Sequence, residues 1–231
     1  MSSHGLEYTG LEILQILQEA RNYNRYLADL CERAAGQTRD ALDFGAGIGT
    51  FAELIRDRGF AVRCVEADAH LAERLRHNGF ETFIDLSSIA DSSTDYVYTL
   101  NVFEHIEDDR SVLQTLAAKL RLGGRLLVYV PAFEFLWSAL DDRVQHHRRY
   151  TRTTLRDLLT SAGLQVEECR YADSLGYLAA LLFKLAGNRE GNLSPTAVRA
   201  YDRFAMPFSI ALDKVACRFL GKNVYAICRK P

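Results

Sequence analysis

The sequence lacks the features that mark secreted, zinc-binding and membrane-spanning proteins. It has five cysteines, an odd number, scattered along the chain and never spaced as C-x-x-C: Cys31, Cys64, Cys169, Cys217 and Cys228. This pattern argues against a disulfide framework or a zinc site and is typical of a reducing compartment. The N-terminus has no basic start followed by an apolar stretch, as a secretory signal would, and no apolar run approaches the ~20 residues of a spanning helix. We therefore expect a cytoplasmic protein.

A large excess of charge is also missing. The 231 residues include 28 Lys and Arg against 30 Asp and Glu, a net charge of −2. The chain as a whole does not attract nucleic acid, and we expect no such partner. Its 48% hydrophobic and 25% charged residues are ordinary for a soluble protein. The length suffices for one large domain, or for a domain with a cap.

What the sequence does contain is an alternation of short apolar strands and amphipathic helices. Apolar residues at helical spacing predict helices over 11–35, 51–58, 69–78 and 109–120, the last ended by Gly123-Gly124. Between them, strands are expected at 40–44, 60–66, 81–85, 95–101 and 125–130. This alternation predicts an α/β fold with a Rossmann-like, doubly wound, mostly parallel sheet. Ligands of such sheets bind at the carboxyl ends of the strands, where Asp43, Glu66 and Asn101 lie.

From residue 151 the pattern changes. A helix ends at Gly163, strands follow at 164–171 and 223–229, and two apolar helices are expected at 175–186 and 196–220, the second kinked at Pro207. These two strands bring the expected number of strands in the sheet to seven. We divide the chain into an N-terminal helical segment (1–36), a core (37–172), a helical cap inserted near the C-terminus (173–222) and a final strand of the core (223–231). The cap helices are read as a subdomain with its own small core; the alternatives are an apolar substrate pocket and a surface that rests on a membrane.

A glycine-rich loop follows the first strand, in "ALDFGAGIGT". Its alternate glycines permit a tight turn and a close approach of ligand to backbone: Gly45, Gly47 and Gly49. The dinucleotide fingerprint would need a glycine where Thr50 stands, and the acid before the loop, Asp43, would repel a pyrophosphate. A ligand with a cationic end suits that acid better. S-adenosylmethionine (SAM) is such a ligand, and Glu66 at the end of the second strand can accept hydrogen bonds from its ribose.

These segments resemble the class I SAM-dependent methyltransferases. The matching stretches are "LDFGAGIGT", "VEAD", "IDLSSI", "LNVFEHIEDD" and "LRLGGRLLVYVPA", within residues 20–135. The resemblance implies that Asp43 and the glycine loop hold the methionine part of SAM and that Glu66 binds the ribose hydroxyls. It also implies that Asp85 and Leu86 lie by the adenine, and Asn101 by the methionine or the methyl group.

A looser resemblance points to a bacterial subgroup that acts on small metabolites, some of them in glycan or lipid-linked pathways. It rests on "ARNYNRYLADL", "VPAFEFLWSALDD" and "HHRRYTRTTL". It implies that Tyr23 closes over the cofactor, and we assign Trp137 to substrate binding.

A run of cationic residues precedes the helix that begins near residue 151: Arg143, His146, His147, Arg148, Arg149, Tyr150, Arg152 and Arg156. Such a run is often a solvated helix face. Its position before a helix N-terminus instead favours an anionic substrate, with Arg149 gripping a carboxylate or phosphate. The candidate general bases are His105, His146, His147 and Tyr150, although a histidine at position 105 can equally be structural. Asp141-Asp142 alone is too little for a metal site, and no metal is expected.

The expected activity is in-line transfer of the SAM methyl group to a small molecule, anionic or with an apolar part, giving S-adenosylhomocysteine (SAH). The alternatives are a SAM- or SAH-binding protein without turnover and a SAM-fold enzyme with a non-methyl reaction such as cyclisation. The acceptor atom and the oligomeric state are left open.

Overall fold

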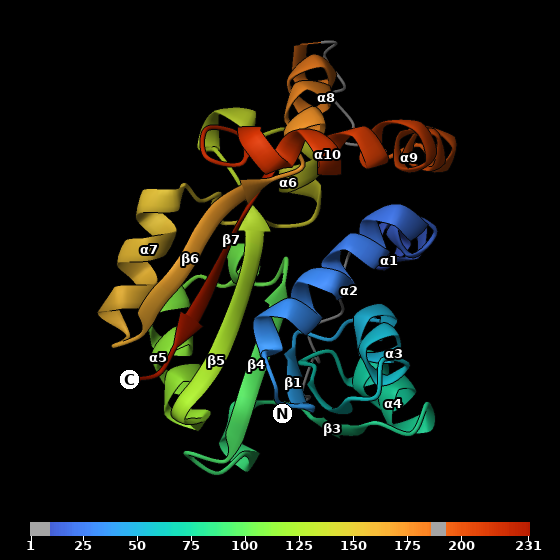
Figure 1. Ribbon diagram of the computed structural model, residues 1–231. Coiled ribbons are helices and arrows are strands. Elements are labelled where there is room, and N and C mark those ends of the chain that lie inside the picture. Colours follow the sequence, from blue (N-terminus) through green and yellow to red (C-terminus); the bar gives the residue numbers. More distant parts are fainter. Residues whose placement is uncertain (1–9, 186–192) are drawn as a thin grey trace.

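The protein is built on a seven-stranded sheet of order β3-β2-β1-β4-β5-β7-β6 (Figure 1). This computed structural model describes residues 10–185 and 193–231. β7 is antiparallel to both of its neighbours, and the other pairs are parallel, so the predicted fold is confirmed. The strands are β1 Asp40–Phe44, β2 Ala61–Val65, β3 Glu81–Phe83, β4 Thr94–Leu100, β5 Leu120–Pro131, β6 Gln165–Ala172 and β7 Asn223–Arg229.

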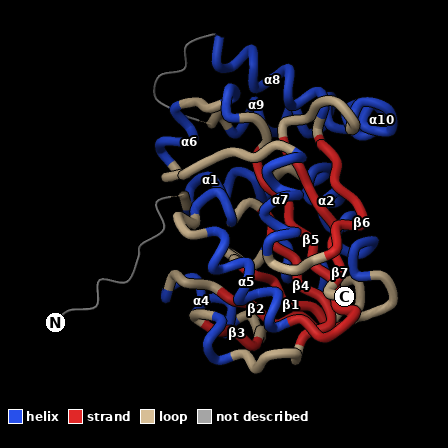
Figure 2. Tube along the Cα trace, turned by 90° about the vertical axis from the view of Figure 1, so that its left-hand side faces the viewer, coloured by secondary structure: helices blue, strands red, loops and turns tan. Residues whose placement is uncertain are grey.

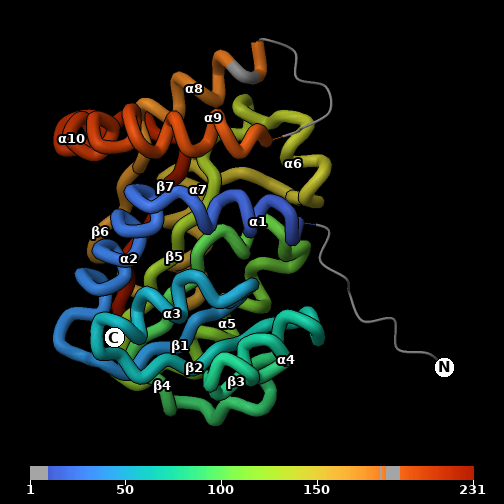
Figure 3. The backbone as a smooth tube through the Cα atoms, turned by 90° about the vertical axis from the view of Figure 1, so that its right-hand side faces the viewer, coloured from blue at the N-terminus to red at the C-terminus, as the bar shows by residue number. Residues whose placement is uncertain are grey.

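Helices cover both faces of the sheet. α1 (Leu11–Gln18), α2 (Arg21–Ala35), α3 (Thr50–Arg56) and α4 (Ala69–His77) are seen from one side in Figure 3. The opposite side, in Figure 2, carries α5 (Asp109–Lys119) and α7 (Arg152–Ser161). β5 shows why both faces are apolar: Leu126 and Val128 pack in the cluster of α5 and α7, while Leu127 packs in the cluster of α2. Successive side chains of a strand point to opposite faces, so a strand covered on both sides is apolar throughout.

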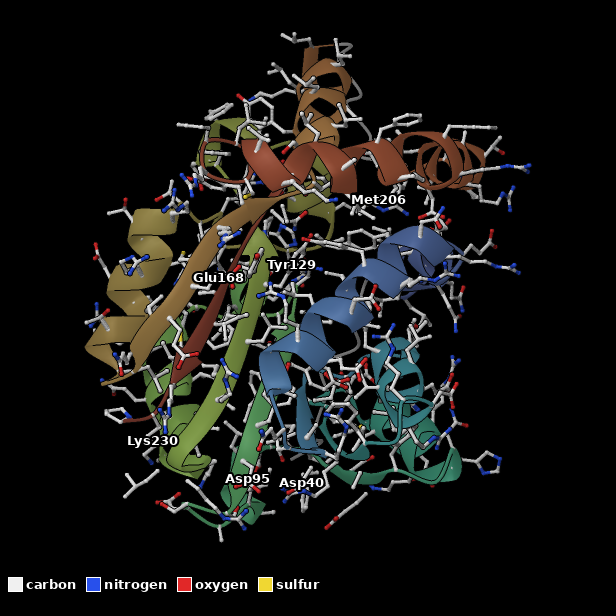
Figure 4. All side chains as sticks on the ribbon, viewed as in Figure 1. Asp40, Asp95, Tyr129, Glu168, Met206 and Lys230 are labelled. Atoms are coloured by element: carbon white, nitrogen blue, oxygen red, sulfur yellow. The ribbon has the colours of Figure 1, made fainter. Side chains whose placement is uncertain are left out.

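The cap lies between β6 and β7 in the chain and at the carboxyl ends of the parallel strands. It consists of α8 (Ser174–Leu185), α9 (Pro195–Ala200), a π-helical turn (Tyr201–Ala205) and α10 (Met206–Ala216). In Figure 4, Asp40 and Asp95, from the first residues of β1 and β4, lie at the edge far from the cap, whereas Met206 lies in the cap itself. The described helices include none that is long and apolar enough to cross a membrane.

A buried polar cluster anchors the cap to the sheet. The Asp213 carboxylate of α10 accepts hydrogen bonds from the main-chain N–H groups of Asp173 and Ser174 at 2.7 and 2.9 Å. The Ser209 hydroxyl of α10 donates to the Asp173 carboxylate at 2.8 Å. Because these groups are buried and paired, the junction of β6 with α8 is held in one geometry.

Several element boundaries differ from the predicted ones, and three of the differences have a clear structural form. The helix expected over 11–35 is broken at Glu19 and Ala20 into α1 and α2. The helix expected over 196–220 is interrupted before Pro207 by the π-helical turn, since a proline disrupts the turn that precedes it. Gly123 and Gly124 do not end a helix: α5 ends at Lys119, and both glycines lie within β5, where the register with β4 shifts.

All five cysteines are free and buried. Free thiols are typical of proteins in a reducing compartment. The cytoplasmic location stays a prediction.

Candidate active site

The glycine loop connects β1 to α3 in a conformation that favours glycine. Gly45, Gly47 and Gly49 have φ of +81°, +56° and +90°, in the left-handed region that other residues avoid. At Gly45 a Cβ would lie 2.4 Å from Cγ2 of Val102. The loop therefore packs directly against the segment that follows β4, and position 45 has no room for a side chain.

Asp43 stands at the carboxyl end of β1, buried beneath this loop. Its carboxylate accepts a hydrogen bond from the Tyr98 hydroxyl at 3.0 Å. Burial raises the pKa of Asp43 to about 8, against the Tyr98 hydrogen bond, which lowers it; the charge of Glu66 raises it further. Asp43 forms no ion pair with any residue in the described ranges. A cationic ligand group beside it would stabilise its charge.

Glu66 follows β2 and reaches the same loop. Its carboxylate accepts hydrogen bonds from the main-chain N–H groups of Gly47 at 2.7 Å and Asp68 at 2.9 Å. Burial raises the pKa of Glu66, and these two N–H groups offset part of the effect. The structure therefore brings Asp43, Glu66 and the glycine loop together, as the strand ends predict.

Tyr23 and Asn101 form a second part of this rim. Asn101 follows β4 with φ of +54° and accepts a hydrogen bond from the Asn223 amide at 3.3 Å. Tyr23 is half-buried in α2, and burial raises its pKa to about 12, against the neighbouring polar groups of Tyr129 and Asn101, which lower it. The Tyr23 side chain thus lies by the end of β4.

Asp85 and Leu86 lie where β3 ends. The exposed Asp85 carboxylate accepts a hydrogen bond from the Ser87 N–H at 2.7 Å, and the Ser87 hydroxyl lowers its pKa. Leu86 is buried in the core. The contacts described for Asp85 are local ones, and its place by the adenine stays a prediction.

A second cluster of titratable side chains lies in the loop after β4 and in the segment that follows β5. Glu104 is 1% exposed, neither carboxylate oxygen has a hydrogen-bond partner among the described residues, and burial raises its pKa to about 8. The rings of His105 and His146 stand edge to face with centroids 4.6 Å apart. Burial lowers the pKa of His105 to about 4, and the charge of His146 lowers it further. His105 is therefore neutral at neutral pH.

Asp141 organises this cluster. It accepts a hydrogen bond from His146 Nδ1 at 2.8 Å and two from the Arg149 guanidinium at 2.8 and 2.9 Å. Although burial acts in the opposite direction, these hydrogen bonds hold the pKa of Asp141 well below its usual range. The Arg149 guanidinium, predicted to grip the substrate, thus binds an acid of the protein itself. The Trp137 indole donates to Asp142 at 2.8 Å, with its ring 6.4 Å from that of His146.

The other two predicted bases have different surroundings. The Tyr150 hydroxyl lies 2.8 Å from the Asp109 carboxylate and 3.2 Å from the Phe103 carbonyl. His147 is exposed, and its main-chain N–H donates to the Glu104 carbonyl at 2.7 Å. Of the four candidates, the structure brings together His105 and His146.

Residues 18–169 match the family model described as a methyltransferase domain. This match covers more than half of the chain and includes the glycine loop and both acids of the rim. The chain belongs to the methyltransferase-domain family. The predicted resemblance is confirmed at this level.

Two relatives of this methyltransferase domain are bacterial proteins. It is 31% identical over 150 residues to a probable S-adenosylmethionine-dependent methyltransferase of Mycolicibacterium smegmatis, covering 60% of this chain and 56% of that protein. It is also 31% identical over 166 residues to the C-methyltransferase NovU of Streptomyces niveus, covering 66% of this chain and 39% of that protein. The chain thus spans about half of these relatives or less.

A solved structure of similar fold is a SAM-dependent methyltransferase of Thermotoga maritima, described as a possible histamine N-methyltransferase. The two share a TM-score of 0.63 at 16% sequence identity, over 96% of this chain and 99% of that one. At this identity the likeness shows that the methyltransferase fold extends over nearly the whole chain, and says nothing of the substrate.

Sequence reasoning missed Glu104 and the role of Asp141 in this methyltransferase domain. Glu104 directly precedes His105 in the sequence, and an acid next to a candidate base could have drawn attention to it. Glu104 is unusual because its carboxylate is buried without a hydrogen-bond partner in the described parts of the chain. That depends on packing rather than on the local sequence. Asp141 is the first member of the Asp141-Asp142 pair, whose neighbours in space, His146 and Arg149, come from the cationic run.

Proposed function

We propose that this protein is an enzyme that transfers a methyl group from SAM to a small-molecule acceptor and releases SAH. The observation that carries the proposal is the pair of acids around the glycine loop. Asp43 is buried and Glu66 is bonded to the loop itself. A ligand with an ammonium and a ribose but no phosphate suits two acids at this position, where a pyrophosphate would be repelled.

The residues present fit SAM. We assign Asp43 to the ammonium, Glu66 to the ribose hydroxyls, and the backbone of Gly45, Gly47 and Gly49 to the close approach of the methionine part. Tyr23 and Asn101 are assigned to the methionine end, and Asp85 and Leu86 to the adenine. When bound, SAM supplies a methyl group already activated by its sulfonium. The protein's contribution is then to orient the acceptor and exclude water, which can supply roughly 7–11 kcal/mol.

His146 is the general base that the geometry favours. Asp141 accepts from its Nδ1 at 2.8 Å, which fixes the tautomer and leaves Nε2 to receive a proton from an acceptor. A positioned base of this kind adds about 10²–10⁴-fold when the nucleophile must lose a proton. Burial lowers the pKa of His105 to about 4, so His105 is a weak base at neutral pH.

We further propose an acceptor that carries an anionic or an apolar part, a metabolite of a lipid or glycan pathway being one such class. The anionic preference would come from the positive charge of the cationic run as a whole. Arg149 would have to give up its hydrogen bonds to Asp141 to bind a substrate directly, and Trp137 lies beside His146. The roles of His147 and Tyr150 in catalysis stay predictions. A SAM-binding protein without turnover and an enzyme with a non-methyl reaction remain the competing functions.

Calorimetric titration of SAH tests the cofactor site. We expect wild-type protein to bind one SAH per chain and Asp43→Ala to lose binding. Asp40→Ala is the matched control, because it removes the same side chain from the far end of β1. Equal binding by the Asp43 and Asp40 variants would contradict the proposed site.

His146→Ala should keep SAH binding and lose turnover with an acceptor, whereas retained turnover would exclude His146 as the base.

A further inference from the structure

Glu104, His105 and His146 present three metal-binding atoms to one another. One ligand atom from each of the three side chains lies within 4.8 Å of the other two, and His146 Nε2 is 3.9 Å from Glu104 Oε1. Two ligands of a tetrahedral Zn²⁺ ion lie roughly 3.3 Å apart, given metal–ligand bonds of about 2.0–2.2 Å. The Glu104 and His146 atoms would have to approach by about 0.6 Å, and any pair at the 4.8 Å limit by about 1.5 Å, to reach that separation.

The carboxylate of Glu104 gives independent evidence for a cation between the three side chains. It is almost fully buried, and both oxygens lack hydrogen-bond partners among the described residues. A buried acid without partners is costly, and an ion or a proton is required to neutralise it. A cation between Glu104 and the two imidazoles would meet that requirement.

Both histidines are also oriented by a hydrogen bond to a second group, as is usual for histidines that bind metals. His146 uses Nδ1 for the Asp141 carboxylate, and His105 is hydrogen-bonded to the main chain of Val144. Histidines that bind metals commonly donate their second ring nitrogen to a carboxylate or a main-chain carbonyl, which fixes the ring and its tautomer. Arg149 in turn fixes Asp141 through two hydrogen bonds.

We propose that Glu104, His105 and His146 bind a divalent first-row transition-metal ion, of which Zn²⁺ is one, beside the methyl-transfer site. Two imidazoles and one carboxylate are a ligand set used for such ions, with further positions left open for water or substrate oxygen. This assignment departs from the sequence-based expectation of no metal. A metal on Nε2 would prevent His146 from taking a proton there, so His146 would act as the base only in the metal-free protein. In the metal-bound protein, given the proposed function, the open positions would select an acceptor with a hydroxyl or carboxylate oxygen and favour its deprotonation.

Metal-free protein titrated with Co²⁺ and followed by visible absorption tests the site directly. We expect one Co²⁺ per chain, displaced by Zn²⁺, with Glu104→Gln and His146→Ala each losing binding. Asp141→Asn should bind about 10–100-fold more weakly, as for other residues that orient a ligand. His147→Ala is the matched control, because its side chain is exposed and its contact with Glu104 is through the main chain.

Thermal unfolding of each variant shows whether it is folded, and SAH titration of the same metal-free samples separates the two proposals. Absence of one-to-one binding by wild type, or wild-type binding by folded His146→Ala, would overturn the metal site. SAH binding by metal-free protein would leave the proposed function standing in either case.

A separate observation concerns the outer face of the cap. Five large apolar side chains follow one another at helical spacing along and beside α10, on one face of it. All five are exposed, up to 75% for the last: Phe204, Phe208, Leu212, Val215 and Phe219. Among the described cap residues, the exposed charged side chains are all cationic: Lys184, Arg199, Arg203, Lys214, Arg218 and Lys222. The two described acids of the cap helices, Asp202 and Asp213, are buried.

We infer that this face, which we call the cap face, rests on an anionic lipid surface. An apolar helical face bordered by lysine and arginine is the pattern of helices that lie in the membrane interface, and a negative surface attracts such cations. The cap lies at the carboxyl ends of the strands (Figure 1), so only the cap would separate a lipid surface on its outer face from the proposed methyl-transfer site. This proposal is independent of the metal.

Flotation of the full chain with lipid vesicles tests it. We expect at least about tenfold more protein on vesicles containing phosphatidylglycerol than on pure phosphatidylcholine, and release by high salt. The double variant Phe208→Ser/Phe219→Ser should lose binding, and Leu122→Ser, which changes an exposed leucine outside the cap, should keep it. Failure of wild type to float, or equal flotation of the double variant, would overturn the inference. So would a wild-type dimer that the double variant disrupts, because the face would then bind a second copy of the chain.

Discussion

Within residues 10–185 and 193–231, Tyr98 is the one side chain that donates a hydrogen bond to Asp43, in a site otherwise unfavourable for the Asp43 charge. Burial and the charge of Glu66 raise its pKa, and the hydroxyl of Tyr98 opposes them. A SAM ammonium binds the ionised carboxylate better than the neutral acid. Binding is therefore linked to loss of a proton from Asp43.

This linkage predicts that SAH affinity rises with pH. Asp43 is mostly protonated below its pKa of about 8, so affinity should increase between about pH 6 and pH 8, by at most about tenfold per unit. Asp43→Asn should bind weakly with little pH dependence over that range. Calorimetry at several pH values measures both. A flat wild-type profile would mean that Asp43 is ionised in the free protein or does not meet the ligand.

Tyr98→Phe offers a finer test of the same contact. We expect it to raise the pKa of Asp43, weaken SAH binding at pH 7 and lower stability by about 1–2 kcal/mol, because a buried carboxylate loses its partner. Tyr96→Phe is the matched control: it is equally buried on β4, but its hydroxyl donates to the Cys31 carbonyl at 2.9 Å. If the two variants bind SAH equally, the hydroxyl of Tyr98 has no role in the site.

Residue-scale features divide into those that the sequence predicts and those that it does not. Asp43 and Glu66 were placed correctly at neighbouring strand ends, because strand order in a doubly wound sheet determines which ends meet. The bond of Arg149 to Asp141 was not predicted. The two are eight positions apart across a turn, and a cationic run gives no sign of which of its members already has a partner.

At the scale of elements, α2 depends on the cap for its N-terminus. The N-cap residue of α2 is Ala20, whose side chain cannot accept a hydrogen bond from the helix. Instead the Asp202 carboxylate, 180 residues along the chain from Asn22, accepts hydrogen bonds from the N–H groups of Asn22 at 3.0 Å and Tyr23 at 2.8 Å. The π-helical turn that carries Asp202 thus fixes the first turn of α2, and with it Tyr23.

Asp202→Ala should therefore weaken cofactor binding, although Asp202 lies outside the cofactor site. We expect a loss of about 1 kcal/mol in stability, as for other lost N-caps, and weaker SAH binding through Tyr23. Arg199→Ala is the control, since it removes the exposed ion pair with Glu19 between the same two parts of the protein and should cost well under ~1 kcal/mol. Denaturant unfolding and SAH titration measure these effects. Unchanged SAH affinity in Asp202→Ala would show that the cap does not position Tyr23.

The helices and strands were largely predictable, and the errors in two helix boundaries share a cause. The order and type of strands and helices followed from apolar periodicity and glycine stops. The break at Ala20 was missed because Asp202, which is distant in sequence, takes the place of a local cap there. The break near Pro207 lies earlier than predicted, because the π-helical turn that carries Asp202 precedes the proline. A pattern within one segment cannot contain that information.

At the scale of the whole molecule, the sheet and cap should unfold together. Asp202 joins the cap to α2, and Asp213 joins it to the end of β6, so neither part is complete without the other. We expect one calorimetric transition, shifted upward by about 5–10 °C at SAH concentrations near 100 times Kd. Two transitions, with SAH shifting the higher one alone, would show that the cap is an independent unit.

The position of β7 has a consequence for how the protein is made. β7 lies between β5 and β6 and pairs with both over seven residues, yet it is synthesised after every other strand of the sheet. Until it emerges from the ribosome, β6 has no strand to join, and one edge of β5 is unpaired. Exposed edges of this kind are prone to pair wrongly. The nascent chain thus passes through a stage in which the five strands from β3 to β5 can form the cofactor rim, while β5 has an open edge and β6 has no partner. Chaperone dependence should end when β7 inserts.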